Sequence, residues 1–388
     1  MIAIILFWLC VAAVFHSYIL FPVLLRFFAL FHRSKQPADP SAGLPFVSIL
    51  LAAFNEENVI GDKIRSVCAG TYPAGKYEIL VGLDGCTDGT FEVARKLAKE
   101  FSCIRALNYP VREGKPNVIN KLADESSGSI LVFTDANVMF DEGTLEAIIR
   151  PFSDPRIGLV DTRMINLGLK KEGISFQEKA YISREVGIKN LESRLWGTMM
   201  GPFGGCFAIR RNLFEPIPRN FLVDDFFLNM KVLESGFRAV NNPAARVYED
   251  VSNDLLIEYR RKIRIATGNF QNLARFRKLL FSRFPGLSFC FWSHKVLRWL
   301  GPVFLLVALI SLGILSFSST FYLILLIGYA AIFLVLLLDY TLKKLNLHIP
   351  FLRFVTHFLA MNLAMAKGML EYLKGVKSNV WQPTKRHQ

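Results

Sequence analysis

The sequence predicts an α/β domain, built on a βαβ sheet and flanked by transmembrane helices. Between residues 46 and 282, short runs of β-branched residues alternate with amphipathic stretches, as expected for strands and helices that follow one another. Long apolar runs lie on both sides of this segment, and a hydrophobic content of 52%, with 34 phenylalanines, exceeds that of an ordinary soluble domain. The 388 residues leave room for a domain of roughly 250 residues together with membrane segments.

Residues 1–30 are predicted to form an N-terminal transmembrane helix. The run up to about Leu25 is almost uncharged and is long enough to cross a hydrocarbon core of about 30 Å. A secretory signal would carry basic residues before its apolar stretch, whereas Arg26, Arg33 and Lys35 follow this one. The excess of positive charge on that side places the following domain in the cytosol, after a Pro-rich linker at 36–45.

The central segment 46–282 is predicted to be the catalytic domain. Its hydrophobic runs and helix signals define the elements. The expected strands cover 47–53, 78–83, 129–134 and 157–162, and the expected helices follow Asn55, Asp88 and Glu142 and cover 175–195.

Residues 283–388 are predicted to form a C-terminal membrane region. Apolar stretches at about 299–316 and 320–340 predict two spans joined by a tight turn. The stretch 351–373 is long enough to cross but carries several polar and charged residues, so it is either an interfacial helix or a third span, with the interfacial helix favoured. If 351–373 crossed the membrane, the basic tail that follows it would lie on the outer side, which contradicts the positive-inside rule. The sequence therefore predicts a multi-pass protein of the cell membrane with a cytosolic catalytic domain.

The net charge of +14 is concentrated next to the apolar segments. No Asp or Glu occurs from Tyr259 to Leu338, while ten Lys and Arg residues lie in the first half of this stretch. A basic surface beside membrane spans favours contact with lipid headgroups. Nucleic acid is not expected as a partner, since no aromatic platform or nucleic-acid module accompanies the charge.

The six cysteines show no CxxC pairing and no nearby histidines. Neither a zinc site nor a disulfide framework is expected, which agrees with a reducing compartment.

The first two strands of the sheet end in polar motifs. Ala53, Asn55 and Glu56 end the first strand, and the second runs into Asp84 and Asp88, four residues apart around a glycine turn. Ligands of open α/β sheets bind at such strand ends, where a carboxylate accepts hydrogen bonds from a base or ribose. Helix capping by Asn55 and Asp88 is the alternative explanation.

A third motif, Asp135-Ala136-Asn137, follows the strand at 129–134. Two oxygen-bearing side chains two residues apart suit Mg²⁺ or Mn²⁺, with the remaining ligands supplied by a diphosphate and water. A plain turn is the alternative for a tripeptide of this kind.

A glycine-rich segment containing Gly204 and Gly205 precedes the acidic pair Asp224 and Asp225. Glycines allow close approach of the backbone to a ligand. Two adjacent carboxylates among apolar neighbours can have one pKa raised, which suits a general base, although acids at a helix start also act as caps.

Arg261 and Arg264 lie on a basic helix before Gly268. Arginines in this position could hold a diphosphate leaving group, or they could form a face directed at the membrane surface. The two functions are compatible.

In their order, these motifs resemble the GT-A glycosyltransferases of family 2, which include cellulose, chitin and hyaluronan synthases. The resemblance covers roughly residues 46–271 and includes Gly114-Lys115 before the DxD-like Asp135-Ala136-Asn137. It implies a Rossmann-like mixed sheet that binds a nucleotide sugar. It also implies the following roles. The donor nucleotide contacts Ala53, Asn55, Glu56, Asp84, Asp88, Lys115 and Asp135; the metal binds Asp135 and Asn137; the sugar or acceptor contacts Gly204, Gly205 and Asp224; the diphosphate contacts Arg261 and Arg264; and Asp225 is the base.

The resemblance implies an inverting enzyme that uses Mg²⁺ or Mn²⁺ and moves a sugar from a UDP- or GDP-sugar to a lipid-linked or saccharide acceptor. Such transfer serves cell-envelope or extracellular polysaccharide synthesis. The motif that is QxxRW in processive synthases reads Arg261-Lys-Ile-Arg264-Ile265 here, without the Trp that stacks on a sugar, so a short product is favoured. A processive synthase and a non-catalytic nucleotide-sugar-binding membrane protein are the alternatives.

Overall fold

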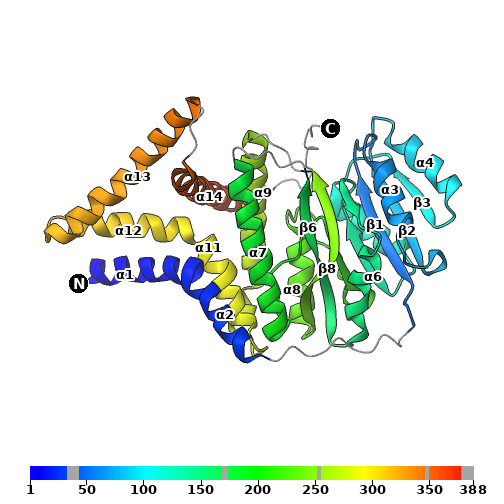
Figure 1. Cartoon of the computed structure of the whole chain (residues 1–388), viewed down its shortest axis with the longest axis horizontal. Helices are drawn as coiled ribbons and strands as arrows, with labels where there is room; N and C mark the ends of the chain where they lie inside the picture. Colours follow the sequence, from blue (N-terminus) through cyan, green and yellow to red (C-terminus); the bar gives the residue numbers. More distant parts are fainter. Residues whose placement is uncertain (33–42, 168–173, 251–254, 346–348, 377–388) are drawn as a thin grey trace.

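The computed structural model describes residues 1–32, 43–167, 174–250, 255–345 and 349–376. Most of the expected linker at 36–45, and the basic tail from 377 onward, lie outside the described residues. Within them, an α/β domain forms one side of the molecule and a group of apolar helices forms the other (Figure 1).

A mixed sheet of eight strands, in the order β3-β2-β1-β4-β7-β6-β8-β5, forms the centre of the α/β domain. Strands β1, β2, β3 and β4 are mutually parallel, β7 runs antiparallel to β4 and β6, and β8 runs parallel to β6. The bounds are β1 Val47–Ala53, β2 Tyr77–Asp84, β3 Ile104–Tyr109, β4 Ile130–Thr134, β5 Val138–Phe140, β6 Ile157–Leu167, β7 Cys206–Arg210 and β8 Arg238–Asp250.

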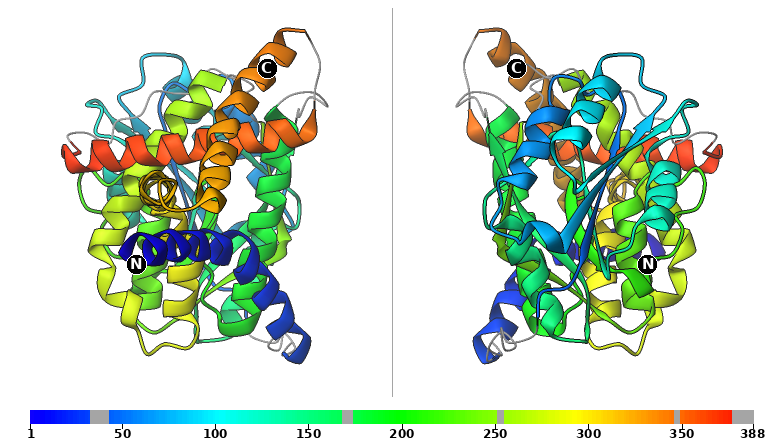
Figure 2. Two further views of the ribbon diagram at one scale, coloured as in Figure 1. Left: turned by 90° about the vertical axis from the view of Figure 1, so that its left-hand side faces the viewer. Right: turned by 90° about the vertical axis from the view of Figure 1, so that its right-hand side faces the viewer.

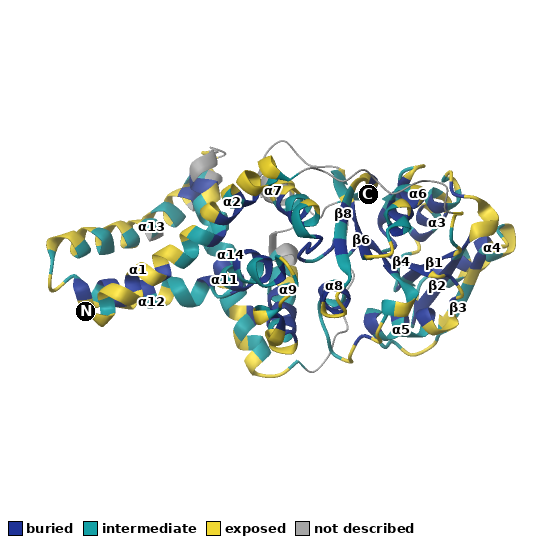
Figure 3. Ribbon diagram, turned by 90° about the horizontal axis from the view of Figure 1, so that it is seen from below, coloured by how far each residue is buried: buried dark blue, intermediate teal, exposed yellow. Residues whose placement is uncertain are grey.

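Helices cover both faces of this sheet, and α5 lies on the opposite side from α3 and α6 (Figure 3). Successive side chains of a strand point to opposite faces, so Ile49 and Leu51 pack under α3 while Leu50 packs under α5. Burial on both faces accounts for the continuous apolar runs of the parallel strands. The helices are α3 Ile60–Cys68, α4 Thr90–Glu100, α5 Lys115–Glu125, α6 Thr144–Ile149, α7 Ile174–Trp196, α8 Asp224–Glu234 and α9 Leu255–Arg275.

All four expected strands are present as β1, β2, β4 and β6, and the expected helices are present as α3, α4, α6 and α7. Strand β8 was not expected, because Asn241-Asn242-Pro243 is a strong turn signal. The strand passes through this tripeptide by shifting its register with β6 between Asp161 and Arg163. Pairing with a long neighbouring strand thus outweighs the local preference for a turn.

The apolar helices are α1 Ile2–Phe15, α2 Phe21–Phe31, α12 Gly301–Leu315 and α13 Thr320–Lys344. Two stretches of the described residues, 2–31 and 320–339, are long and apolar enough to cross a membrane. A third candidate is the pair Leu287–Trp299 and Gly301–Leu315, which is bent by 61°. The predicted span at about 299–316 therefore corresponds to the second arm of a bent helix.

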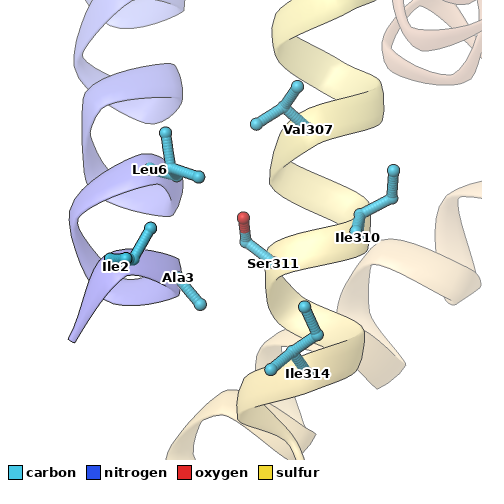
Figure 4. A pocket seen from close by; sticks show the side chains of 7 residues that line it. All are labelled: Ile2, Ala3, Leu6, Val307, Ile310, Ser311 and Ile314. Atoms are coloured by element: carbon cyan, nitrogen blue, oxygen red, sulfur yellow. The ribbon is translucent and has the colours of Figure 1, made fainter.

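Helices α1, α12 and α13 extend away from the α/β domain (Figure 1). Their outer faces are exposed along most of their length (Figure 3), and these faces include Leu9, Ile310 and Ile324. A shallow apolar hollow between α1 and α12 is lined by side chains of both helices near the N-terminus (Figure 4). A continuous exposed apolar surface of this extent is typical of contact with lipid.

Helix α14, Pro350–Leu373, runs crosswise to α12 and lies against the α/β domain (Figures 1 and 2). It packs tightly on α9, since a Cβ atom at Gly368 would lie 2.4 Å from the Cβ of Ala266, and the rings of Phe270 and Tyr372 stack at 6.2 Å. It does not qualify as a candidate span among the described residues.

Residues 287–299 belong to the core on the α5 side of the sheet. The side chains of Leu287, Phe291 and Trp299 are buried in one cluster with Leu50 of β1 and Phe226 of α8. Packing is therefore continuous across the expected domain boundary at residue 282, and the segment that leads into the apolar helix α12 packs directly on the α/β domain.

Candidate active site

The loops that follow β1 and β2 are joined by hydrogen bonds. Asn55, which has a positive φ of 53°, accepts a hydrogen bond from the Thr87 N–H at 2.9 Å. Glu57 accepts one from the Gly89 N–H at 2.7 Å, and the N–H of Glu56 donates to the Thr90 hydroxyl at 2.8 Å. These two loops and the buried end residue Ala53 form one rim of the site, which is the predicted nucleotide side.

Asp88 and Asp84 have clear structural partners at this rim. Asp88 accepts from the Thr90 N–H at 3.1 Å just before α4, but the N-cap of that helix is Gly89, without a side-chain capping bond, so the capping alternative is wrong for Asp88. The buried Asp84 accepts two backbone hydrogen bonds, from the N–H groups of Glu113 at 2.7 Å and Gly114 at 2.9 Å. Asp84 thereby fixes the loop that leads into α5 and places Lys115 at the first turn of that helix.

Lys115 and Asp135 form an ion pair in the centre of the site. The Lys115 Nζ lies 2.6 Å from Asp135 Oδ1 and 3.4 Å from the carbonyl oxygen of Gly204. Although burial disfavours the charged form, the carboxylates of Asp135 and Asp224 raise the pKa of Lys115 above its ordinary value. Lys115 therefore places a positive charge between Asp135 and the carbonyl oxygen of Gly204.

The two predicted metal ligands differ in their surroundings. Asp135 keeps 36% of its side chain exposed. Asn137 is buried, and its Nδ2 donates to Glu249 of β8 at 2.8 Å. Among the described residues, no group of three His, Cys, Asp or Glu side chains is arranged to hold a metal alone. One exposed carboxylate fits Mg²⁺ or Mn²⁺, which often bind one or two protein oxygens and complete their shell with phosphate and water.

A buried lysine on α3 supports the turn that carries this motif. Lys63 is 1% exposed, and its ammonium donates to the carbonyl oxygen of Val138 and lies 3.7 Å from the centre of the Phe140 ring. Burial lowers the pKa of Lys63 to about 7. A lysine in an amphipathic helix pattern is expected at the surface, so its burial here could not be predicted from the sequence.

The acidic pair predicted to include the base lies at the first turn of α8, opposite Lys115. A Cβ atom at Gly204 would lie 2.7 Å from the Oδ2 of Asp225, so the Asp225 carboxylate rests directly on the backbone of residues 199–205, which we call the glycine loop. Burial and the neighbouring Asp224 raise the pKa of Asp225 to about 6. This value suits a general base that works near neutral pH.

Gly205 links the two central motifs through its main chain. Its carbonyl oxygen accepts a hydrogen bond from the Asp135 N–H at 3.0 Å. A side chain at this position would clash with the Phe203 ring at 2.6 Å and with Val138 at 2.9 Å. At both positions, therefore, side chains of the protein itself leave no room for a Cβ atom: Phe203 and Val138 at Gly205, and Asp225 at Gly204.

The basic helix α9 brings Arg264 to the same site. Burial and the nearby Arg261 lower the pKa of Arg264, while Asp224 and Asp225 oppose this shift. An arginine stays protonated at neutral pH despite such a shift. The structure therefore brings together Lys115, Asp135, Asp225 and Arg264 from four different parts of the sequence, whereas Arg261 lies exposed on the same helix as Arg264.

Three buried side chains that the sequence did not predict hold the glycine loop. Asn229 donates to the Met199 carbonyl oxygen at 3.0 Å, Glu192 accepts from the Met200 N–H at 3.0 Å, and Asp161 accepts from the Phe203 N–H at 2.7 Å. Asn229, Glu192 and Asp161 have no exposed surface. Asp161 also pairs with Lys189 of α7 at 2.6 Å, which compensates the buried charge. The available sequence signal was the charge of Asp161 inside an apolar strand.

Comparison with known proteins identifies the class of this domain. Residues 48–217 match glycosyl transferase family 2, so the chain contains a glycosyltransferase domain of that family, as its motifs predicted. A β-monoglucosyldiacylglycerol synthase from Trichormus variabilis is 30% identical over 161 residues, which cover 41% of this chain and 34% of the synthase. A poly-β-1,6-N-acetyl-D-glucosamine synthase from Staphylococcus aureus is 25% identical over 283 residues, which cover 69% and 67%. The chain thus spans about a third of the first relative.

A solved structure shows the same fold over nearly the whole chain. The mannosyltransferase from Pyrobaculum calidifontis, in complex with GDP-Man and Mn²⁺, superimposes with a TM-score of 0.73 at 20% identity and covers 95% of this chain and 99% of its own. The α/β domain therefore has the predicted GT-A-like fold.

Proposed function

We propose that this protein is an inverting glycosyltransferase of the cytosolic membrane face, which moves a sugar from a UDP- or GDP-sugar to a lipid-linked or saccharide acceptor. The observation that supports this best is the position of Asp225. Its carboxylate has a pKa of about 6, rests on the Gly204 backbone and faces the Lys115–Asp135 pair. A single base on the acceptor side, with no second carboxylate acting as nucleophile, accounts for inversion.

In this mechanism the protein holds the donor at the rim formed by β1 and β2. Asn55, Glu56 and Asp84 belong to the loops that would enclose the nucleotide. Asp135 would hold Mg²⁺ or Mn²⁺, with Asn137 beside it, and the cation would neutralise the donor diphosphate. The Mn²⁺ in the Pyrobaculum enzyme supports the choice of a divalent cation.

Two positively charged side chains stabilise the leaving group. Lys115 lies on the donor side of Gly204, and Arg264 approaches from α9. As the bond to the sugar breaks, negative charge develops on the diphosphate, and fixed positive charges in a partly buried site stabilise it. Asp225 takes the proton from the attacking hydroxyl of the acceptor, whose path is shaped by Gly204, Gly205 and Asp224.

The apolar helices support a membrane location with residues 2–31, α12 and α13 as spans and α14 at the interface. Helix α14 runs crosswise to α12 (Figure 2), as a helix in the plane of the headgroups would. Because α14 packs on α9, which carries Arg264, the diphosphate side of the site would lie close to the membrane surface. This favours a lipid-linked acceptor.

The test is a transfer assay on the full chain, purified in detergent and supplied with radiolabelled nucleotide sugars, Mn²⁺ or Mg²⁺ and a total lipid extract. We expect release of a nucleoside diphosphate together with label that partitions into the organic phase. Absence of any turnover across the panel would instead indicate a non-catalytic nucleotide-sugar-binding protein.

A processive synthase is the second candidate, favoured by the Staphylococcus aureus relative, whose match covers 69% of this chain. The same assay distinguishes the two functions, because a polymer forms a ladder or a high-mass band on a gel. A single added sugar leaves a product of one defined mass.

A further inference from the structure

The glycine loop of the active site is connected to the helices on the membrane side through one buried histidine. Glu192 of α7 accepts the Met200 N–H with its Oε2, and its Oε1 lies 2.7 Å from the Nδ1 of His294. Met200 is four residues before Gly204, on which the Asp225 carboxylate rests. Two short contacts therefore join His294 to the backbone that supports the base.

His294 is fully buried between two carboxylates. Its Nε2 lies 2.8 Å from Glu185 Oε1, on the opposite side of the ring from Glu192. Glu185 also pairs with Lys295 at 2.6 Å and with Arg298 at 3.0 Å. Although burial opposes it, His294 and Lys295 hold the pKa of Glu185 well below its usual range. The ring therefore bridges the two carboxylates, with Nδ1 hydrogen-bonded to Glu192 Oε1 and Nε2 in close contact with Glu185 Oε1.

The bridge lies where the helices on the membrane side enter the fold. His294 belongs to the π-helical turn Phe291–Val296, which leads through α11, Leu297–Trp299, into the 61° bend before α12. A second π-helical turn, His16–Leu20, separates α1 from α2 and contacts the first. The Ser17 hydroxyl donates to the Ser293 carbonyl oxygen at 2.9 Å, and His16 Nε2 lies 2.8 Å from the Ser293 hydroxyl. Such turns are rare and concentrate at functional sites.

We propose that His294 is a positioning residue. Through Glu192 it connects the contact between the two π-helical turns, His16–Leu20 and Phe291–Val296, to the glycine loop, and it thereby fixes the position of that loop on the acceptor side of the active site. This inference rests on the proposed transfer function. The donor rim is formed by β1, β2 and the loop before α5, whereas both carboxylates beside His294 belong to α7. Loss of the tie should therefore impair the transfer step and leave donor binding intact.

The two ring nitrogens of His294 allow a matched test. In the same backbone position, the amide nitrogen of Asn replaces Nδ1 and can still donate to Glu192, whereas that of Gln replaces Nε2 and reaches toward Glu185. Gln is closer to His in volume, so a role in packing alone predicts that His294→Gln is the milder change. The proposed role predicts the opposite order.

The experiment compares His294→Asn and His294→Gln in the full-length protein. We expect His294→Gln to lower kcat about 10- to 100-fold, as misplacement of a reacting group does, with the donor KM changed less than about twofold. His294→Asn should retain a kcat within about threefold of wild type. Equal kcat values for the two variants, or a milder His294→Gln, would overturn the proposal.

Hydrogen exchange supplies a readout that does not depend on activity. His294→Gln should speed exchange in peptides that contain residues 199–205 and leave the peptide containing residues 113–118 unchanged, because only the former loop depends on Glu192. If wild type is inactive but the exchange differs in this way, the tie stands while the proposed function fails. Unchanged exchange in residues 199–205 would contradict the tie itself.

Two further variants control for stability. Asp339→Asn breaks another buried ion pair, between α13 and Arg353 of α14 at 3.0 Å, and should leave kcat near wild type even where it lowers the melting temperature. Should His294→Gln fail to fold, Glu192→Gln tests the tie from its other end. It keeps an oxygen for the Met200 N–H but removes the charge facing His294, so a lower kcat at constant donor KM is again expected, and an unchanged kcat would refute the proposal.

Discussion

The proposed donor rim and the proposed acceptor loop of this site are built in different ways. At the donor rim, the motif residues themselves make the contacts, as when Asn55 binds Thr87 and Asp84 binds the loop at Gly114. At the acceptor loop, the motif supplies only glycines, and the holding groups are Glu192 and Asp161, which belong to other elements. The donor side is therefore held by residues of the recognised motifs, while the acceptor side depends on buried side chains that lie outside them.

This difference has a consequence for function. A rim held by its own motif can be kept unchanged while the remainder of the chain varies, which suits the recognition of a nucleotide. A loop held from α7, α8 and β6 can be repositioned by changes far from the site, which suits adaptation to different acceptors. Substitutions at the donor rim should accordingly raise mainly the KM for the nucleotide sugar, whereas substitutions at the acceptor loop should lower mainly kcat.

The largest effect is expected for Asp225→Asn on the acceptor side. Removing the base should lower kcat about 10³-fold or more, within the range attributed to general base catalysis. The amide is nearly isosteric, so the Kd for the nucleoside diphosphate, measured by calorimetry, should stay within a factor of two to three of wild type. Near-normal turnover of Asp225→Asn would assign the base elsewhere.

Gly204→Ala should have the next largest effect. The added methyl group would lie 2.7 Å from Asp225 Oδ2 and must displace the carboxylate, so we expect kcat to fall about 100-fold. Gly143→Ala, before α6, is the matched control, since nothing lies within 4 Å of the added Cβ atom there. Steady-state kinetics of both variants test the close contact, and a fully active Gly204→Ala would show that Asp225 can move without loss.

The pH profile of wild type should show the base directly. Because the pKa of Asp225 is raised to about 6, the carboxylate becomes protonated and inactive as the pH falls through that value. With a single such group, kcat/KM should fall about tenfold between pH 7 and pH 5. A profile that is flat over this interval would exclude a base with this pKa.

The smallest effect is expected on the donor side, for Asp84→Asn. The amide can replace only one of the two acceptors for the N–H groups of Glu113 and Gly114, and it lacks the charge that strengthens them. We expect the KM for the nucleotide sugar to rise about tenfold while kcat changes less. An effect on kcat alone would show that the two sides are not separable.

Much of the fold and part of the site follow from local sequence. The parallel strands β1, β2 and β4 were predicted because burial on both faces produces continuous apolar runs of β-branched residues. Strand β8 was missed because its turn-forming Asn-Pro sequence is overruled by pairing with β6. The motif residues Lys115, Asp135, Asp225 and Arg264 were selected by residue type and order, and the fold brings them together.

The sequence by itself determined the apolar helices, the α/β class and the order of the chemical motifs, because these depend on hydrophobic periodicity and on short-range spacing. Only the tertiary structure decided that Lys63, Asp161, Glu192 and His294 are buried beneath the site. A charged residue is expected at the surface until its partner is known, and partners such as Val138 for Lys63 and Glu192 for His294 are brought into contact only by the fold. The acceptor side of the site is therefore a property of packing, and the donor side a property of sequence.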